Sequence, residues 1–275
     1  MDHAKAPLRL GCQTYTWEML GDRYQGGPDQ LLAMIAEAGY AGIEITDRMI
    51  GHYRDRPEAF DTALRQNGLT LVAYAVGSES GFTEPAARAA DLGAAESAIA
   101  FAGHFPGALV SFGSATIMSP GERLDKFAAA AEFYNAAGRL GEKADVAVAL
   151  HPSSHHNTLL FTRADYDAIF ARTDEAVIGW VPDTGHILRG HEDMLDVLRR
   201  YQSRIRYLHL KDVDEDGHWA MLGSGDCDID SVIEIVRAAP RFNGWLVVEE
   251  ESDAAAADPV AAVRKNRVRM RDFGI

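Results

Sequence analysis

Short apolar runs alternate with longer amphipathic stretches along this chain, and the alternation repeats eight times. The apolar runs are rich in Val, Ile and Leu and are largely uninterrupted. Such runs are typical of strands that are buried on both faces of a parallel sheet. They predict eight strands, at residues 8–13, 42–46, 69–76, 108–112, 146–151, 177–181, 205–210 and 245–249.

The stretches between these runs carry apolar residues at helical spacing. They predict helices at residues 28–38, 57–66, 122–140, 163–172, 193–201, 230–238 and 259–273. Pro28, Pro57 and Pro259 stand where the first turn of a helix is expected, and there the missing N–H costs nothing. Four successive alanines at residues 254–257 are interpreted as part of a loop.

A strand–helix unit that repeats eight times predicts an α/β protein with one closed (β/α)₈ barrel, the TIM-barrel architecture. A doubly wound open sheet is the alternative. It is disfavoured because residues 13–17, which follow the first strand, contain no glycine-rich phosphate loop. No segment has the composition of a linker, so residues 1–275 are expected to form a single domain.

Composition excludes several classes of partner. The net charge of −14 repels phosphate backbones, so nucleic acid is not expected to bind. No apolar run approaches the roughly 18 residues that a membrane span needs. The short polar segment at residues 1–9 does not resemble a secretory signal, and Cys12 and Cys227 form no paired motif, so a cytoplasmic protein with unbridged thiols is expected.

Four consecutive predicted strands end in an imidazole or a carboxylate, namely His151, Asp183, His209 and Glu249. Catalytic groups of a parallel barrel gather at these carboxyl ends of the strands. A mixed imidazole and carboxylate set suits a first-row divalent ion. The pattern predicts that the four side chains hold one such ion, with Mn²⁺ as the first choice and Co²⁺, Fe²⁺, Zn²⁺ and Mg²⁺ as alternatives. If Glu251 points inward in place of Glu249, the register of the last strand is different.

Other polar residues near these strand ends are candidates for catalysis. Lys211 either polarises a substrate oxygen or forms an ion pair with a neighbouring glutamate. His155 and His156 follow the fifth strand, and each is either a general acid or base or part of a solvated loop. Glu44, on the second strand, is expected to bind substrate, to support a metal ligand, or to be an internal barrel carboxylate paired with Lys or Arg.

A further set of residues is expected to contact the substrate or to line its pocket. His186 follows the sixth strand closely. Trp17, Tyr15, Phe82 and Trp219 are aromatic residues near predicted strand ends, where they either form the wall of a sugar pocket or contribute to ordinary packing.

Four motifs carry a family resemblance over essentially the whole chain. They are Tyr-Ala-Gly-Ile-Glu at 40–44, Pro-Asp-Thr-Gly-His at 182–186, His-Leu-Lys-Asp at 209–212 and Gly-Trp-Leu-Val-Val-Glu at 244–249. With them the chain resembles the xylose isomerase-like barrel superfamily, also called the sugar phosphate isomerase/epimerase family. Within that superfamily it is most similar to inosose dehydratase-like proteins, which also have a histidine-rich segment after strand five.

The resemblance implies a metal held by Glu, Asp, His and Glu from strands five to eight. The last three positions correspond to Asp183, His209 and Glu249. The first position departs from the family pattern, because His151 stands where the epimerases have Glu. A 3-epimerase exchanges a proton on both faces of one carbon with two carboxylates. Replacement of one carboxylate by His151 therefore disfavours epimerisation.

The resemblance and this departure together indicate a metal-dependent lyase for a keto-sugar, keto-inositol or 3-keto-glycoside. The expected chemistry is proton abstraction α to a carbonyl by Glu249 or a nearby imidazole, followed by β-elimination assisted by His155, His156 or Lys211. A sugar isomerase or epimerase is the alternative. A nuclease like those that cut abasic DNA, or a regulatory barrel in a hetero-oligomer, is a more distant one. The sequence leaves a homo- or hetero-oligomeric state open.

Overall fold

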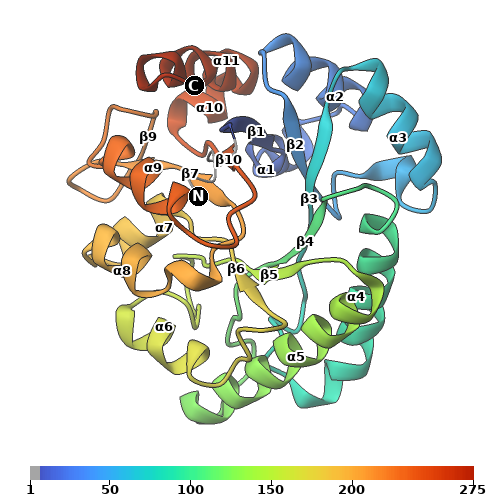
Figure 1. Ribbon diagram of the computed structural model, residues 1–275, viewed down its shortest axis with the longest axis vertical. Helices are drawn as coiled ribbons and strands as arrows, with labels where there is room; N and C mark the ends of the chain where they lie inside the picture. Colours follow the sequence, from blue (N-terminus) through green and yellow to red (C-terminus); the bar gives the residue numbers. More distant parts are fainter. Residues whose placement is uncertain (1–6) are drawn as a thin grey trace, which may run out of the picture.

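Eight parallel strands curl around a common axis in the computed structural model of this protein, which describes residues 7–275 (Figure 1). Residues 1–6, which make up most of the segment interpreted as lacking a secretory signal, lie outside the described residues. The barrel strands are β1 (Arg9–Gln13), β2 (Gly42–Thr46), β3 (Thr70–Val76), β4 (Leu109–Phe112), β5 (Val148–Leu150), β6 (Gly179–Trp180), β7 (Leu208–Leu210) and β10 (Trp245–Val248).

Neighbouring strands pair in the order β6-β5-β4-β3-β2-β1-β10-β7. The two ends of this sheet meet through single backbone bridges. The amide of Arg206 donates to the carbonyl of Trp180 at 2.9 Å, and the amide of His209 donates to the carbonyl of Pro182 at 2.9 Å. The predicted TIM barrel is therefore confirmed, with each of its eight strands lying inside a predicted range.

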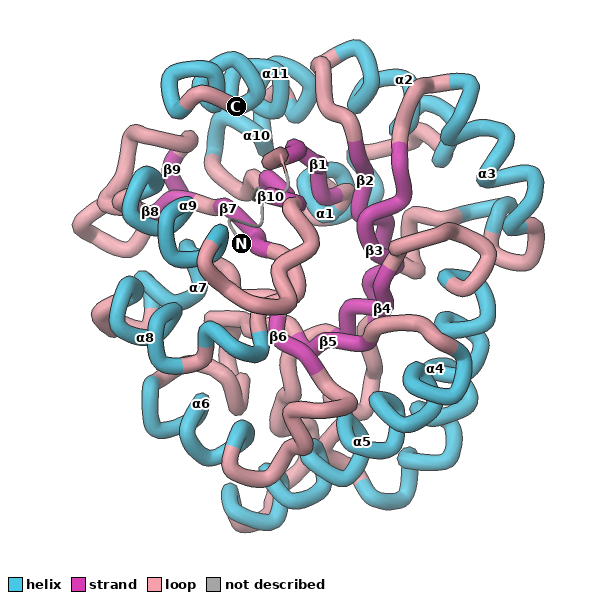
Figure 2. The backbone as a smooth tube through the Cα atoms, viewed as in Figure 1, coloured by secondary structure: helices cyan, strands magenta, loops and turns pink. Residues whose placement is uncertain are grey.

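Helices surround the strands on the outside (Figure 2). They are α2 (Pro28–Glu37), α3 (Pro57–Gln66), α4 (Arg88–Ala102), α5 (Arg123–Ala144), α6 (Arg163–Phe170), α7 (Thr184–Arg189), α8 (Met194–Arg200), α9 (Ile229–Arg237) and α11 (Pro259–Arg269). Pro28, Pro57 and Pro259 each begin a helix, as predicted. Among the described residues 7–275, no helix is long and apolar enough to cross a membrane.

The structure corrects the prediction at several short elements. Residues 254–257, interpreted as a loop, belong to helix α10 (Asp253–Ala257), because the Ser252 hydroxyl caps the amide of Ala255. Helices α1 (Tyr15–Glu18), α4 and α7 were not predicted. Helix α4 is rich in alanine and so shows little contrast between an apolar and a polar face. An antiparallel pair, β8 (Asp212–Val213) and β9 (Trp219–Ala220), extends the loop after β7.

An apolar plug fills the lower part of the barrel. It consists of the buried residues Val72, Ala73, Leu109, Ala149, Val181, Tyr207, Trp245 and Val247. Side chains alternate along a strand, so the residue two positions further on faces the same interior. On four strands that residue is a predicted metal ligand: His151 follows Ala149, Asp183 follows Val181, His209 follows Tyr207 and Glu249 follows Val247. The four candidate ligands therefore lie one layer above the apolar plug.

Helix α5 packs against the start of β6 through Gly138, where a methyl group would lie 2.7 Å from the carbonyl oxygen of Val177. We expect Gly138→Ala to lower the free energy of unfolding by about 1–3 kcal/mol through overpacking. The matched control is Gly93→Ala in α4, where a methyl group meets nothing within 4 Å. The control should be neutral or stabilise by about 0.5–1 kcal/mol. Urea unfolding of both variants measures the difference, and equal effects would contradict this packing.

Candidate metal centre and catalytic cavity

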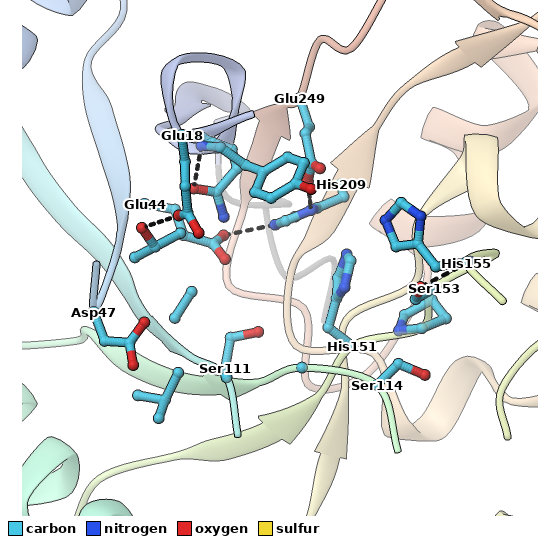
Figure 3. A pocket seen from close by; sticks show the side chains of 18 of the residues that line it. Glu18, Glu44, Asp47, Ser111, Ser114, His151, Ser153, His155, His209 and Glu249 are labelled. Carbon is cyan, nitrogen blue, oxygen red and sulfur yellow. Dashed lines mark hydrogen bonds and ion pairs between the residues drawn. The ribbon is translucent and has the colours of Figure 1, made fainter. Parts of the chain in front are cut away.

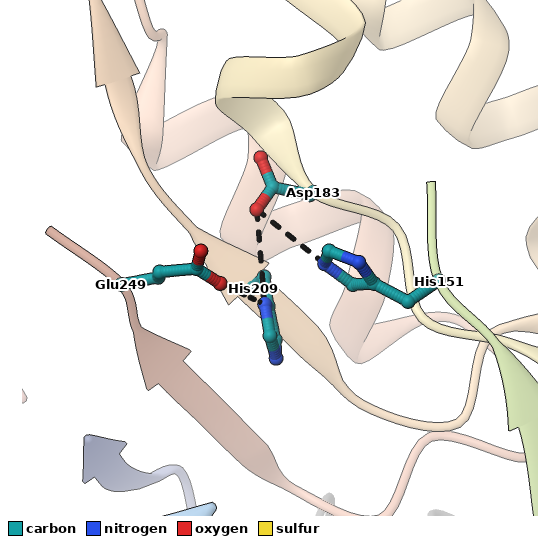
Figure 4. A group of neighbouring side chains, drawn as sticks. All are labelled: His151, Asp183, His209 and Glu249. Atoms are coloured by element: carbon teal, nitrogen blue, oxygen red, sulfur yellow. Dashed lines mark hydrogen bonds and ion pairs between the residues drawn. The ribbon is translucent and has the colours of Figure 1, made fainter. Parts of the chain in front are cut away.

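His151, Asp183, His209 and Glu249 converge at the carboxyl end of the barrel (Figure 4). One ligand atom of each residue lies within 4.8 Å of the corresponding atoms of the other three. Asp183 Oδ2 is 3.6 Å from His151 Nε2 and 3.7 Å from His209 Nδ1. Glu249 Oε2 lies 2.7 Å from the same His209 Nδ1. The four ligand atoms thus surround a small common space.

Two atoms that face this space are buried and lack a hydrogen-bond partner among the described residues. They are Asp183 Oδ2 and His151 Nε2. The other oxygen of Asp183 accepts the amide of His186 at 2.8 Å and so caps helix α7. A buried polar atom without a partner is costly, and a gap of 3.6 Å is too long for a hydrogen bond. A cation between the two atoms would satisfy both, so this donor set fits a metal ion.

His209 is oriented by a carboxylate from the opposite side of the barrel. Its Nε2 lies 2.6 Å from Glu44 Oε2, and both side chains are buried. With a proton on Nε2, the other ring nitrogen, Nδ1, is directed at Asp183 and Glu249. A carboxylate behind a histidine is the usual support for a metal-binding imidazole. Burial disfavours a charged His209, but Glu44, Asp183 and Glu249 outweigh it and raise the pKa of His209 well above its ordinary value.

Lys211 is fully buried behind the carboxylates. Its ammonium lies 2.8 Å from Glu249 Oε1, 2.5 Å from Glu251 Oε1 and 3.7 Å from Asp183 Oδ2. Burial opposes ionisation of Glu249, yet Lys211 and His209 hold the pKa of this carboxyl well below its usual range. For Glu251, burial dominates and raises the pKa to about 7. Lys211 therefore supplies the positive charge that balances these buried carboxylates.

His186 is held as a neutral imidazole. Its Nδ1 accepts the backbone amide of Ser154 at 3.0 Å, which places the ring proton on Nε2. That nitrogen lies 3.5 Å from the Lys211 ammonium, and His186 also belongs to a second close group with Glu249 and Glu251. Burial and the charge of Lys211 lower the pKa of His186 well below its ordinary value. His186 therefore lines the cavity as an uncharged imidazole.

A cavity of about 340 Å³ opens above this cluster, within the size range of small-molecule sites (Figure 3). Three of the four predicted ligands, all but Asp183, contribute to its lining. His155 also lines the cavity, and its ring centre is 5.8 Å from that of His186. Burial and the charge of Lys211 lower the pKa of His155, which favours the neutral, proton-accepting form near pH 7.

Comparison with protein families identifies this architecture. The model of the family described as xylose isomerase-like TIM barrel matches residues 32–272 of the chain. The chain belongs to this family. An inosose dehydratase of Clostridium tetani (strain Massachusetts / E88) is 32% identical over 156 residues, which are 50% of this chain and 51% of that protein. The chain thus spans about half the length of the curated relatives it matches.

Solved structures share the family fold over nearly the full chain. The 3-keto-D-glucoside 4-epimerase YcjR from E. coli, in its apo form, covers 96% of this chain and 99% of its own, with a TM-score of 0.75 and 17% identity. The IOLI protein, solved with a zinc atom, covers 96% of each chain with a TM-score of 0.75 and 14% identity. At these identities the likeness shows the fold alone.

Most of the residues predicted for the site of this xylose isomerase-like barrel do meet in one place. The four candidate ligands form one cluster, and Glu249 points into it, with Glu251 beside it. The cavity lining also includes the predicted residues Glu44, His155, His186, Tyr15 and Phe82. The Glu44 carboxylate contacts His209 and also lines the cavity, and no Lys or Arg among the described residues forms an ion pair with it.

Four predicted contact residues lie elsewhere. Trp17 is 1% exposed and faces a separate apolar groove, because positions 15 and 17 of helix α1 are about 200° apart around its axis. His155 and His156 are both exposed, but only His155 belongs to the cavity lining. Lys211 lies behind the cavity lining and pairs with Glu249. Trp219 packs against Lys211, and its ring centre lies 4.5 Å from the ammonium. These positions argue against direct substrate contact.

The sequence interpretation missed polar residues on the other half of the barrel rim. Gln13 ends β1, Asp47 directly follows β2 and Ser111 lies in β4, and all three line the cavity together with Glu18 of α1. The same signal that identified the four ligands, a polar residue at the carboxyl end of a strand, was present at Gln13 and Asp47.

The counter-charge role of Lys211 predicts a large loss of stability in Lys211→Met. Buried Glu249 and Glu251 would lose their partner, which should cost about 3–5 kcal/mol of unfolding free energy. The exposed Lys265→Met is the control and should change stability by less than about 0.5 kcal/mol. Denaturant unfolding in the presence of a chelator measures both. Adding Glu251→Gln to Lys211→Met should recover part of the loss, and no loss in the single variant would contradict the role.

Proposed function

We propose that this protein is a divalent-metal-dependent lyase that acts on a keto-sugar, keto-inositol or 3-keto-glycoside. The proposed reaction is proton abstraction α to the ketone, followed by β-elimination. The observation that carries this proposal is the imidazole of His151, which stands at the position where the epimerases have a carboxylate. Its Nε2 lies 3.6 Å from Asp183 Oδ2. The similarity to proteins named inosose dehydratase also supports an elimination.

His151, Asp183, His209 and Glu249 are the proposed metal ligands, with Mn²⁺ as the preferred ion. When bound, a divalent ion supplies Lewis-acid polarisation of the substrate carbonyl. The unpartnered atoms of His151 and Asp183 support this set over the second group, His186–Glu249–Glu251. In that second group Lys211 already pairs with both carboxylates.

His155 is the proposed proton carrier. Glu249 is poorly suited to this task, because Lys211 and His209 occupy its two oxygens and hold its pKa low. His155 lines the cavity, and in its neutral form it can accept a proton near pH 7. The His155 amide also donates to the hydroxyl of Ser153 at 3.1 Å, which helps to hold this segment beside the cavity.

The elimination balances without an oxidant or reductant. The C–H bond α to the ketone breaks, and its proton moves to the neutral His155 imidazole. The electron pair forms a carbon–carbon double bond as the C–O bond at the β-carbon breaks. The leaving oxygen then takes the proton from His155, which returns to its neutral form. From a keto-inositol the leaving group is water, and from a 3-keto-glycoside it is the alcohol that was bound to C1.

The two glutamates beside Lys211 do not form a pair on two faces of a substrate carbon. Glu249 and Glu251 both follow β10 and both contact Lys211, so they belong to one wall of the cavity. An epimerase needs a second base on the opposite face of the same carbon. Interconversion of free ketoses without an eliminated product would return this protein to the isomerase and epimerase class.

Metal content is expected to distinguish the proposed ligands from their neighbours. Asp183→Asn and His151→Ala should each greatly lower the amount of Mn²⁺ that stays bound through gel filtration, because each removes a ligand atom. His186→Ala is the matched control, since it removes a nearby buried imidazole from outside the proposed set. Elemental analysis of the purified proteins provides the measurement. Full occupancy in Asp183→Asn, or a loss confined to His186→Ala, would overturn the assignment.

Two adjacent histidines allow a test of the proton carrier. His155→Ala should lower turnover by on the order of 10²–10⁴-fold, the usual contribution of general acid–base catalysis. His156→Ala should leave turnover nearly unchanged, because this residue lies outside the cavity lining. The assay follows enone absorbance with keto-inositols and 3-keto-glycosides in the presence of Mn²⁺. Equal losses in both variants, or a loss only in His156→Ala, would exclude His155 as the carrier.

A further inference from the structure

The cavity extends across the barrel, well beyond the candidate metal centre. In the ring of eight strands, β2 lies four strands away from β6, and β3 lies four strands away from β7. Asp47, which follows β2, therefore stands opposite Asp183, which follows β6. The hydrogen bond between Glu44 and His209 crosses the barrel between these two sides. Figure 3 shows Asp47 and His155 at opposite ends of the same cavity.

The cavity wall formed by β1, α1 and β2 runs from beside Glu249 to the side opposite Asp183, and it presents hydrogen-bonding groups that the protein itself leaves partly unused. The Asp47 carboxylate lines the cavity, and no side chain of a described residue forms a hydrogen bond or ion pair with it, although the charges of Arg54 and Arg48 and the backbone amide of Arg48 act on it. Gln13 is 3% exposed, and its Oε1 accepts the amide of Tyr15 at 3.2 Å. Its Nε2 group has no acceptor within the part of the chain that the structure describes. Glu18 Oε2 accepts the hydroxyl of Thr46 at 2.5 Å, and its Oε1 lies 3.8 Å from Arg48 Nε.

The chemistry of this wall selects among possible ligands. Asp47 and Glu18 are acidic, and the one basic lining residue beside them, Arg48, lies 3.8 Å from Glu18, so this wall keeps a net negative charge and disfavours phosphate or carboxylate groups. Carboxylates with spare lone pairs accept hydroxyl protons, and the amide of Gln13 donates to a hydroxyl or ring oxygen. This alternation of acceptors and donors suits a polyol, and an apolar group there would leave the buried amide of Gln13 without a partner.

We infer that this wall, formed by Gln13, Glu18 and Asp47, is a subsite for a second hydroxyl-bearing unit of the substrate. The inference rests on the proposed function and narrows it: the substrate is a 3-keto-glycoside whose leaving group is itself a sugar or polyol. The ketone-bearing ring lies at the metal centre, beside His155. The C2–H and C1–O bonds break, C1 and C2 become doubly bonded, and the second unit departs as an alcohol with the transferred proton.

Two substrates with the same reacting ring test the subsite. Methyl 3-keto-glucoside loses methanol, whereas 3-keto-cellobiose loses glucose, so only the second substrate reaches the Asp47 side. We expect wild-type protein to have a higher kcat/KM for 3-keto-cellobiose. Asp47→Ala should lower that value by on the order of ten-fold, as expected for one hydrogen bond to a charged group, and should leave methyl 3-keto-glucoside unaffected. Asp55→Ala, an exposed aspartate of the same loop, is the matched control and should change neither value.

The outcomes separate this inference from the function on which it rests. If wild-type protein forms enone from both substrates with equal kcat/KM, or if Asp47→Ala slows both equally, the subsite is wrong and the elimination stands. If wild-type protein forms no enone from either substrate but dehydrates keto-inositols, the elimination stands and the two-unit substrate is wrong. If no ketone substrate is eliminated, both proposals fail. A selective loss for 3-keto-cellobiose in Asp47→Ala supports the subsite.

Discussion

Excess negative charge at the mouth of the barrel is the constraint that organises the rest of this structure. Glu44, Asp183, Glu249 and Glu251 gather there with little solvent exposure, and Lys211 contacts the last three. Buried carboxylates are stable only when they are paired or coordinated. The high pKa of His209 expresses the same imbalance, because a proton on its ring partly compensates for the missing positive charge. A divalent cation at this point would remove the need for that proton.

The barrel can concentrate charge in this way because its lower part is apolar and closely packed. The plug beneath the site excludes water from one side, and the alternation of side chains places each candidate ligand one layer above it. The ligands are then restrained individually. Asp183 is held by the capping bond to helix α7, His209 by Glu44, and Glu249 by Lys211. Restraint of this kind orients ligand atoms before an ion arrives.

The two sides of the cavity have different tasks in the proposed reaction. One side combines the proposed ligands with His155, so both the polarising charge and the proton carrier lie beside the same part of the substrate. The wall of β1 and β2 offers the carboxylate of Asp47 and the amide of Gln13, which suit recognition rather than bond cleavage. This division allows specificity to vary on β1 to β3 while the chemistry on β5 to β10 is retained. Loops at the rim of one barrel commonly support such variation.

The sequence by itself determined the barrel and the four residues that cluster, because strand periodicity also specifies which side chain faces inward at each strand end. It could not determine side-chain directions beyond the strands. Tyr15 and Trp17 separate because a helix begins directly after β1, and His155 and His156 differ because the loop backbone turns between them. Only the tertiary structure brought Glu44 to His209, since the closure and width of the barrel, which no local pattern encodes, set distances between residues on opposite strands.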